Sequence, residues 1–168
     1  MVEEKTIILD SEAVNQKLKR MAYEIYENNF QEKEIVFAGI VGNGHVLARL
    51  LGAYLEEISD IRVSIVEVDI DKQAPSSEKV LVNINKNEIE GKNIILVDDV
   101  LNTGRTFIYS LRPFLDLKIP KIQVAVLIDR GHSRYPVTSD FTGLELSTTL
   151  NEHVEVVLKD NTPLVYLT

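Results

Sequence analysis

The sequence predicts a single α/β domain, residues 1–168, in which a doubly wound, mostly parallel sheet carries helices on both faces. A length of 168 residues suits one domain. Apolar residues make up 45% of the chain and charged residues 26%, which is typical of a globular protein. Apolar runs of strand length alternate with segments whose apolar residues recur at helical spacing. This alternation indicates parallel strands joined by helices.

Helical spacing of apolar residues predicts three helices. Asp10 is a favourable N-cap for the first, which we expect over residues 12–28. The second follows the glycine-containing break at residues 42–44 and ends near the acidic pair at residues 56–57. A third is expected over residues 105–117, with a kink or an early end at Pro113 because proline lacks the N–H that a helix interior needs.

The strands are predicted from apolar runs that are either continuous or alternating. A continuous, β-branched run suits a strand covered on both faces, whereas alternation places Glu67 and Asp69 on one face of their strand. The predicted strands are residues 34–41, 61–70, 79–84, 93–97, 122–128, 154–158 and 164–167.

Composition excludes several classes of site. The chain has no cysteine, so disulfides, thiolate nucleophiles and Cys-ligated metal centres are excluded. Its 26 acidic residues outnumber its 18 basic ones, and the net charge of −8 disfavours nonspecific binding to nucleic acid. The longest apolar stretch is too short to cross a membrane, and no signal-peptide pattern is recognisable. We therefore expect a cytoplasmic protein with no membrane partner.

The strongest functional signal is segment 94–106, in which an apolar strand runs into Asp98 and Asp99 and then into a loop that opens a helix. Successive backbone N–H groups in such a loop form an anion cradle, and the hydroxyls of Thr103 and Thr106 add donors. A ligand that places a phosphate at the loop and vicinal hydroxyls at the carboxylates has the groups of a ribose 5-phosphate. The alternative, in which these residues only cap a helix, would require the whole pattern to arise by coincidence.

This segment resembles the phosphoribosylpyrophosphate (PRPP) signature of the type I phosphoribosyltransferases. Further segments resemble one branch of them, the pyrimidine operon attenuator and uracil phosphoribosyltransferase (PyrR) family. The resemblance implies the type I fold with a small hood region, and transfer of ribose 5-phosphate from PRPP to uracil, giving UMP and pyrophosphate. The segments that carry the branch resemblance are residues 8–10, 67–70, 124–132, 136 and 140–143.

The resemblance also implies roles for individual residues. Mg²⁺ is the implied cofactor, held mainly through PRPP, with Asp129, Glu67 and Asp69 as candidate protein ligands. The candidate catalytic residues are Asp98, Asp99, Asp129 and Arg130. The candidate 5-phosphate loop is Asn102, Thr103, Gly104, Arg105 and Thr106. The candidate pyrophosphate loop is Val41, Gly42, Asn43 and Gly44.

The chain departs from the family pattern at both loops. Residues 41–44 carry no lysine or arginine, which the family's pyrophosphate loop usually has. The family's mobile loop, which closes over the site, is longer and more basic than residues 71–79, where only Lys72 and Lys79 are candidate cations. Asn102 stands where purine-using relatives carry an acid that serves as general base, which favours a pyrimidine.

Two alternatives to the uracil enzyme stay open. The chain could be a regulator of the RNA attenuator type that binds PRPP or a nucleotide with weak or no catalysis, or a transferase for a different base. RNA is not an expected partner, because the net charge is −8 and the arginines that the family uses are missing or displaced near His132. The expected partners are PRPP, a nucleobase and further copies of the chain in a homo-oligomer.

Overall fold

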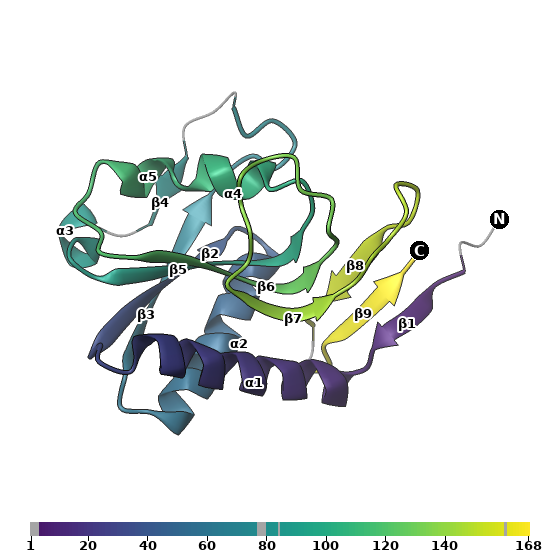
Figure 1. Ribbon diagram of the computed structural model, residues 1–168, viewed down its shortest axis with the longest axis horizontal. Coiled ribbons are helices and arrows are strands. Elements are labelled where there is room, and N and C mark those ends of the chain that lie inside the picture. The colour runs from purple at the N-terminus through teal and green to yellow at the C-terminus, as the bar shows by residue number, and fades with distance from the viewer. Residues whose placement is uncertain (1–3, 77–79, 84, 160) are drawn as a thin grey trace.

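The computed structural model describes residues 4–76, 80–83, 85–159 and 161–168. Its centre is a six-stranded sheet with the order β4-β3-β2-β5-β6-β7, in which neighbouring strands are parallel except for β3 and β4 (Figure 1). A three-stranded antiparallel sheet, β1-β9-β8, stands beside it and forms the hood. The strands are β1 (Thr6–Leu9), β2 (Glu34–Ile40), β3 (Arg62–Asp69), β4 (Leu81–Val82), β5 (Asn93–Leu101), β6 (Ile122–Asp129), β7 (Phe141–Glu145), β8 (Val154–Val157) and β9 (Leu164–Leu167).

Helices cover both faces of the main sheet. α1 and α2 pack on one face, and α3, α4 and α5 pack on the other (Figure 1). Each face has its own apolar core, because successive strand residues point to opposite sides: Phe37 belongs to the first core and Val36 to the second. None of the described helices is long and apolar enough to span a membrane. The helices are α1 (Ser11–Asn29), α2 (Asn43–Ile58), α3 (Lys86–Ile89), α4 (Arg105–Ser110) and α5 (Arg112–Leu115).

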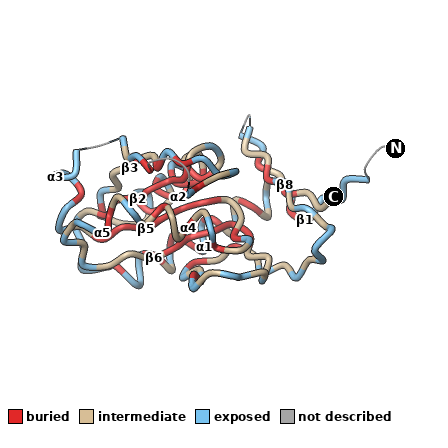
Figure 2. The backbone as a smooth tube through the Cα atoms, turned by 90° about the horizontal axis from the view of Figure 1, so that it is seen from above, coloured by how far each residue is buried: buried red, intermediate tan, exposed pale blue. Residues whose placement is uncertain are grey.

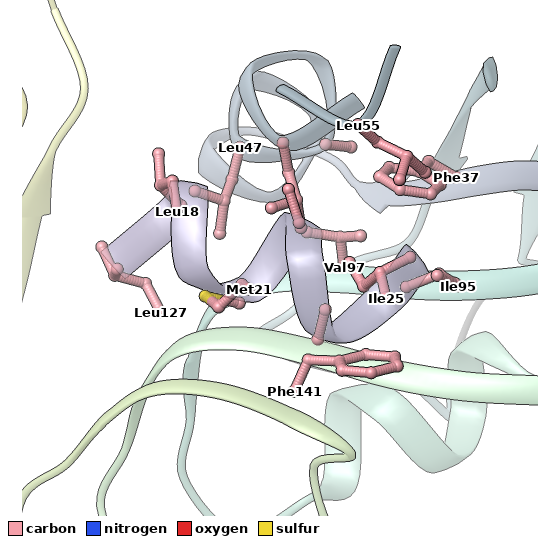
Figure 3. Packing of buried hydrophobic residues seen from close by; sticks show 14 of the residues in the cluster. Leu18, Met21, Ile25, Phe37, Leu47, Leu55, Ile95, Val97, Leu127 and Phe141 are labelled. Carbon is pink, nitrogen blue, oxygen red and sulfur yellow. The ribbon is translucent and has the colours of Figure 1, made fainter. Parts of the chain in front are cut away.

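α1 joins the hood to the main sheet. It begins where Asp10 accepts a hydrogen bond from the backbone N–H of Ala13 at 2.8 Å. Its side chains Leu18, Met21 and Ile25 are fully buried against α2 and the sheet (Figure 3). Burial of each contributes about 1.5–3 kcal/mol to stability. Figure 2 shows that the buried positions follow the strands of the main sheet, which makes it a rigid base for the loops at its edge.

Most predicted elements are confirmed, with their ends shifted by a few residues. The predicted helix over residues 105–117 is divided, because α4 ends at Ser110 and Pro113 lies in the first turn of α5, where a missing N–H costs nothing. The predicted strand over residues 93–97 continues to Leu101, so Asp98 and Asp99 lie within β5.

Three smaller differences concern short elements. β7 was not predicted, and α3 forms where the sequence indicates a polar turn. Of the strand predicted over residues 79–84, β4 (Leu81–Val82) forms, and Lys79 and Ile84 lie outside the described residues.

Candidate active site

A cleft at the carboxyl end of β5 holds the acidic pair and the loop that follows it. Ligands of open α/β sheets bind at this edge, beyond the carboxyl ends of the parallel strands. The cleft has a volume of about 280 Å³ and is lined by Lys72, Asp98, Asp99, Val100, Asn102, Thr103, Gly104, Arg105, Thr106, Phe107 and Val154. A larger hollow of about 540 Å³ between α1, α2 and the hood has Arg49 as its only charged described lining residue.

Asp98 is the buried carboxylate of the cleft. Its two side-chain oxygens both lie 3.1 Å from Lys72 Nζ, and its Oδ1 accepts the backbone N–H of Asp99 at 2.9 Å. Burial, and next the negative charge of Asp99, raise the pKa of Asp98 from 3.8 to about 7, while Lys72 acts in the opposite direction. The cleft therefore contains a carboxylate whose charge changes near neutral pH.

Asp99 is half-buried and is linked to the hood. Its Oδ1 accepts the backbone N–H of Val100 at 2.8 Å, and its Oδ2 accepts Asn43 Nδ2 at 2.9 Å. The same Asn43 nitrogen donates to the carbonyl of Val156 in β8 at 2.8 Å. One amide group therefore connects the start of α2, the acidic pair and the hood.

The start of α2 approaches β5 so closely that only glycine fits. A Cβ atom on Gly44 would lie 2.7 Å from the carbonyl oxygen of Val97 and 2.9 Å from Asp98 Oδ1. Gly42, which precedes the helix, has a φ of 89°, in the left-handed region that glycine adopts without strain. Residues 41–44 thus bring the backbone at Gly44 beside Asp98 while supplying no cationic side chain.

The loop over residues 102–106 forms a second wall of the cleft, and all five of its residues line it. Gly104 has a φ of 85°, and Thr103 Oγ1 accepts the backbone N–H of Arg105 at 3.3 Å. The carbonyl of Thr103 accepts the backbone N–H groups of Arg134 and Tyr135 at 2.9 and 3.0 Å. These bonds fix the turn that forms this wall of the cleft.

Arg130 ties the segment after β7 to this loop. Its Nη1 donates to Asn102 Oδ1 at 2.7 Å, and its Nε donates to Thr148 Oγ1 at 2.9 Å. Its Nη2 donates to the carbonyls of Thr149 and Glu152 at 3.2 and 2.6 Å. Arg130 is therefore not a lining residue of the cleft but the connection between the cleft loop and segment 148–152.

Comparison with known proteins identifies the family. The phosphoribosyl transferase domain family matches residues 4–161. The chain belongs to the phosphoribosyltransferase family. Among curated relatives of this phosphoribosyltransferase is the bifunctional protein PyrR of Clostridium beijerinckii, 37% identical over 93% of this chain and 92% of the relative. The bifunctional protein PyrR of Brevibacillus brevis is 39% identical over 93% of this chain and 91% of the relative.

Solved structures share the phosphoribosyltransferase fold. A hypoxanthine-guanine phosphoribosyltransferase from Bacillus anthracis superposes with a TM-score of 0.71 at 24% identity, covering 86% of this chain and 84% of that one. The hypoxanthine phosphoribosyltransferase of Trypanosoma cruzi gives a TM-score of 0.77 at 15% identity, covering 95% of each chain. At these identities the likeness establishes the type I fold that the signature implies.

The remaining acidic candidates of the phosphoribosyltransferase lie outside the cleft. Asp129 accepts the backbone N–H of Gly131 at 2.9 Å and lines a neighbouring hollow of about 250 Å³. Glu67 and Asp69 lie at the end of β3, beside the edge strand β4, and do not line the cleft. The structure thus brings Asp98, Asp99 and the 102–106 loop together but leaves these three carboxylates apart from them.

A magnesium ion would depend on the substrate for most of its ligands. Within the described ranges, no three Asp, Glu, His or Cys side chains are grouped to hold a metal ion. Mg²⁺ is commonly bound by one or two carboxylates together with phosphate oxygens of a substrate and water. The acidic pair, which lines the cleft together with the 102–106 loop, fits that donor set.

Sequence reasoning missed two residues that contribute to the site and one contact of a third. Lys72 was a candidate cation, but its ion pair with Asp98 was not predicted. Thr148 and Glu152 hold the guanidinium of Arg130, yet their segment has no periodicity or motif that indicates a role. The spacing of polar residues alone could not have revealed these contacts, because each joins segments far apart in the sequence.

Proposed function

We propose that this phosphoribosyltransferase transfers the ribose 5-phosphate of PRPP to uracil in the presence of Mg²⁺, giving UMP and pyrophosphate. The observation that carries the proposal is that one cleft is lined both by the acidic pair and by the whole 102–106 loop. Carboxylates accept hydrogen bonds from the vicinal hydroxyls of ribose, and loop N–H groups and hydroxyls donate to phosphate. The two walls therefore match the two ends of a ribose 5-phosphate.

In this reaction the C1–pyrophosphate bond breaks, a bond from the base nitrogen to C1 forms, and the proton on that nitrogen is released. Positive charge develops on the sugar, and Asp98 and Asp99 stabilise it electrostatically from fixed positions. The pyrophosphate leaves with the electron pair, and Lys72 and Arg105 are the cationic side chains that line the cleft. Mg²⁺, when bound with PRPP, neutralises charge on the leaving group. The chain's own contribution is mainly positioning and electrostatics.

Asn102 supports a pyrimidine as the acceptor. Its Oδ1 already accepts a hydrogen bond from Arg130, and an amide does not act as a general base. The family resemblance places an acid at this position in purine-using enzymes. Uracil is therefore the favoured base, and Arg130 contributes indirectly by holding Asn102.

The second candidate function is a PRPP- or nucleotide-binding regulator with little catalysis. It is favoured by the neutral 41–44 loop, in which Asn43 is bonded to Asp99 and Val156 instead of being available to pyrophosphate. In that case the cleft would still bind PRPP through the acidic pair and the 102–106 loop. Binding and turnover must therefore be measured separately.

The test is a mass-spectrometric assay with PRPP, Mg²⁺ and one base at a time: uracil, orotate, hypoxanthine, guanine, adenine or xanthine. UMP alone is the expected product. A purine nucleotide would keep the PRPP site and reject the base assignment. If no product forms, calorimetric titration with PRPP decides, since tight binding without turnover indicates the regulator. Asp116→Asn, which changes an exposed aspartate at the end of α5 that does not line the cleft, is the matched control for substitutions of Asp99.

A further inference from the structure

A hollow of about 540 Å³ lies between α1, α2 and the hood, and it shares no described lining residue with the active-site cleft. Small-molecule sites occupy roughly 300–1,000 Å³ and combine an apolar wall with a few polar groups. This hollow, called the hood hollow from here on, has both. Its apolar wall is Val46, Leu50, Leu158 and Pro163, and its polar side chains are those of Asn15, Arg49 and Asn161.

Arg49 is the charged residue of the hood hollow, and its guanidinium is unpaired within the part of the chain that the structure describes. It makes no hydrogen bond or ion pair there, although acidic residues outnumber basic ones in this chain. The side chain is exposed, so a ligand can reach it without displacing another residue. A guanidinium presents its N–H donors as a planar fork that fits the two oxygens of a carboxylate. Arg49 is therefore available to an anion that enters the hollow.

Asn15 and Asn161 supply neutral polar groups to the hood hollow, from α1 and from the turn between β8 and β9. Neither side-chain amide has a hydrogen-bond partner among the described residues. Asn161 also has a φ of 56°, in the left-handed region that non-glycine residues rarely adopt. Strained backbone positions of this kind cluster at ligand-binding sites. An asparagine is thus held in a conformation that suits glycine, with its amide at the hollow.

We propose that the hood hollow binds a small carboxylic acid, with its carboxylate on Arg49 and its apolar body between Leu50 and Leu158. One guanidinium balances the single negative charge of a carboxylate. A phosphate dianion is better matched by a second cation or by an open helix N-terminus. No second cation is among the described lining residues, and the N-terminus of α1 is capped by Asp10. The start of α2 lies against β5 at the cleft instead.

A ligand in the hood hollow would connect the same two elements that Asn43 connects at the cleft. Arg49 lies on α2, which begins at Asn43, and Leu158 directly follows β8, where the carbonyl of Val156 accepts the Asn43 amide. The start of α1 lies beside the hood (Figure 1), and Ser11 Oγ donates to the carbonyl of Pro163 at 2.9 Å. A bound acid therefore holds the hood against α2 and opposes its opening. This inference does not depend on which base the enzyme uses.

Calorimetric titration of the full chain with indole-3-acetate tests the chemistry of the ligand. Binding is expected, and the neutral indole-3-acetamide should bind at least about ten-fold more weakly because it lacks the charge that pairs with Arg49. Acetate, which lacks the apolar body, should be weaker to a similar degree. No binding of indole-3-acetate, or equally tight binding of inorganic phosphate, would overturn the proposal. Saturating PRPP should leave indole-3-acetate bound, whereas competition between the two would place the acid in the cleft.

Arg49→Gln tests the place of binding. It should raise the Kd for indole-3-acetate at least about ten-fold. Arg62→Gln is the matched control, because Arg62 is an exposed arginine at the start of β3 that does not line the hollow, and the Kd should stay unchanged. An equal loss in both variants would show a nonspecific effect of charge and reject the site.

Asn161→Gly separates binding from folding. Glycine adopts the left-handed region without strain, so the Tm should stay the same or rise. The Kd for indole-3-acetate should nevertheless rise about three-fold, because an amide that contacts the ligand is lost. Hydrogen exchange gives an independent readout, since bound indole-3-acetate should slow exchange at Val154–Val157. Protection confined to the cleft, with β8 unchanged, would contradict binding in the hood hollow.

Discussion

The side-chain amide of Asn43 donates at once to Asp99 Oδ2, at 2.9 Å, and to the carbonyl of Val156, at 2.8 Å. An asparagine NH₂ group has two hydrogens, so both donors are used. The acidic pair and the hood are consequently held together by the residue that stands in the predicted pyrophosphate loop. Substitution of Asn43 should therefore change both the affinity for PRPP and the stability of the contact with the hood.

Asn43→Lys should tighten PRPP binding by roughly ten-fold, because it supplies a cation that the 41–44 loop lacks and charged hydrogen bonds contribute about 1.5–3 kcal/mol. Asn43→Leu, which removes both donors at similar volume, should instead lower stability by about 1–2 kcal/mol. Calorimetric titration with PRPP and chemical denaturation measure the two effects. Unchanged PRPP affinity in Asn43→Lys would mean that backbone N–H groups already suffice.

Asp99→Asn should weaken PRPP binding at least about ten-fold while the protein stays folded, because a carboxylate that accepts ribose hydroxyls is replaced by a group with half its acceptors. Circular dichroism should remain that of the unaltered chain. Titration of Asp99→Asn beside the Asp116→Asn control measures the difference. Equal affinities in the two variants would rule out a ribose contact at Asp99.

The raised pKa of Asp98 predicts that stability falls with pH. The pKa is about 7 in the folded chain against 3.8 for an ordinary aspartate, so the folded state binds the proton more tightly. The resulting stabilisation is fully present below pH 3.8 and is lost as the pH rises through 7. Asp98→Asn, which cannot ionise, should raise the Tm by several degrees at pH 8 relative to the unaltered chain and less at pH 5.

Lys72→Gln tests the effect of Lys72 on the pKa of Asp98. Because Lys72 lowers the pKa of Asp98, its removal should move the decline in stability to higher pH. Melting curves recorded from pH 5 to pH 9 follow this shift. A decline at the same pH in both proteins would show that Lys72 does not interact with Asp98 in solution.

Arg130→Lys should impair use of the base more than binding of PRPP. A lysine cannot reproduce the contacts of the guanidinium with Asn102, Thr148 and the two carbonyls, so segment 148–152 loses its connection to the cleft loop. The expected result is a higher KM for the base, a nearly unchanged Kd for PRPP and a stability loss of about 2 kcal/mol. A rise in the PRPP Kd alone would instead place Arg130 at the phosphates.

The part of the site that could be predicted from the sequence is the part that is contiguous along the chain. Segment 94–106 combines a strand, two carboxylates and a loop in one stretch, and the structure places them in one cleft. The bond from Asn43 to Asp99 spans 56 positions, and that from Lys72 to Asp98 spans 26. Neither bond produces a periodic pattern in the sequence, because each depends on how the sheet brings distant loops together.

β7 shows why one strand was missed. Its centre is Gly143, and glycine is depleted in strands. A Cβ atom at this position would lie 2.5 Å from the carbonyl oxygen of Leu127, so glycine is what allows β7 to pair closely with β6. The residue that obscures the strand in the sequence is therefore a requirement of its packing.

The hood has a consequence for the order of folding. β9 is its middle strand, and it pairs Thr6 with Leu167 on one side while β8 lies on the other. β1 accordingly has no neighbour in this sheet until the segment over residues 164–167 arrives from the far end of the chain. Such long loop closures are slow, so the hood should be among the last parts to assemble and the first to open in native-state hydrogen exchange. Because Val156 in β8 is bonded to Asn43, completion of the acidic site waits for the same late event.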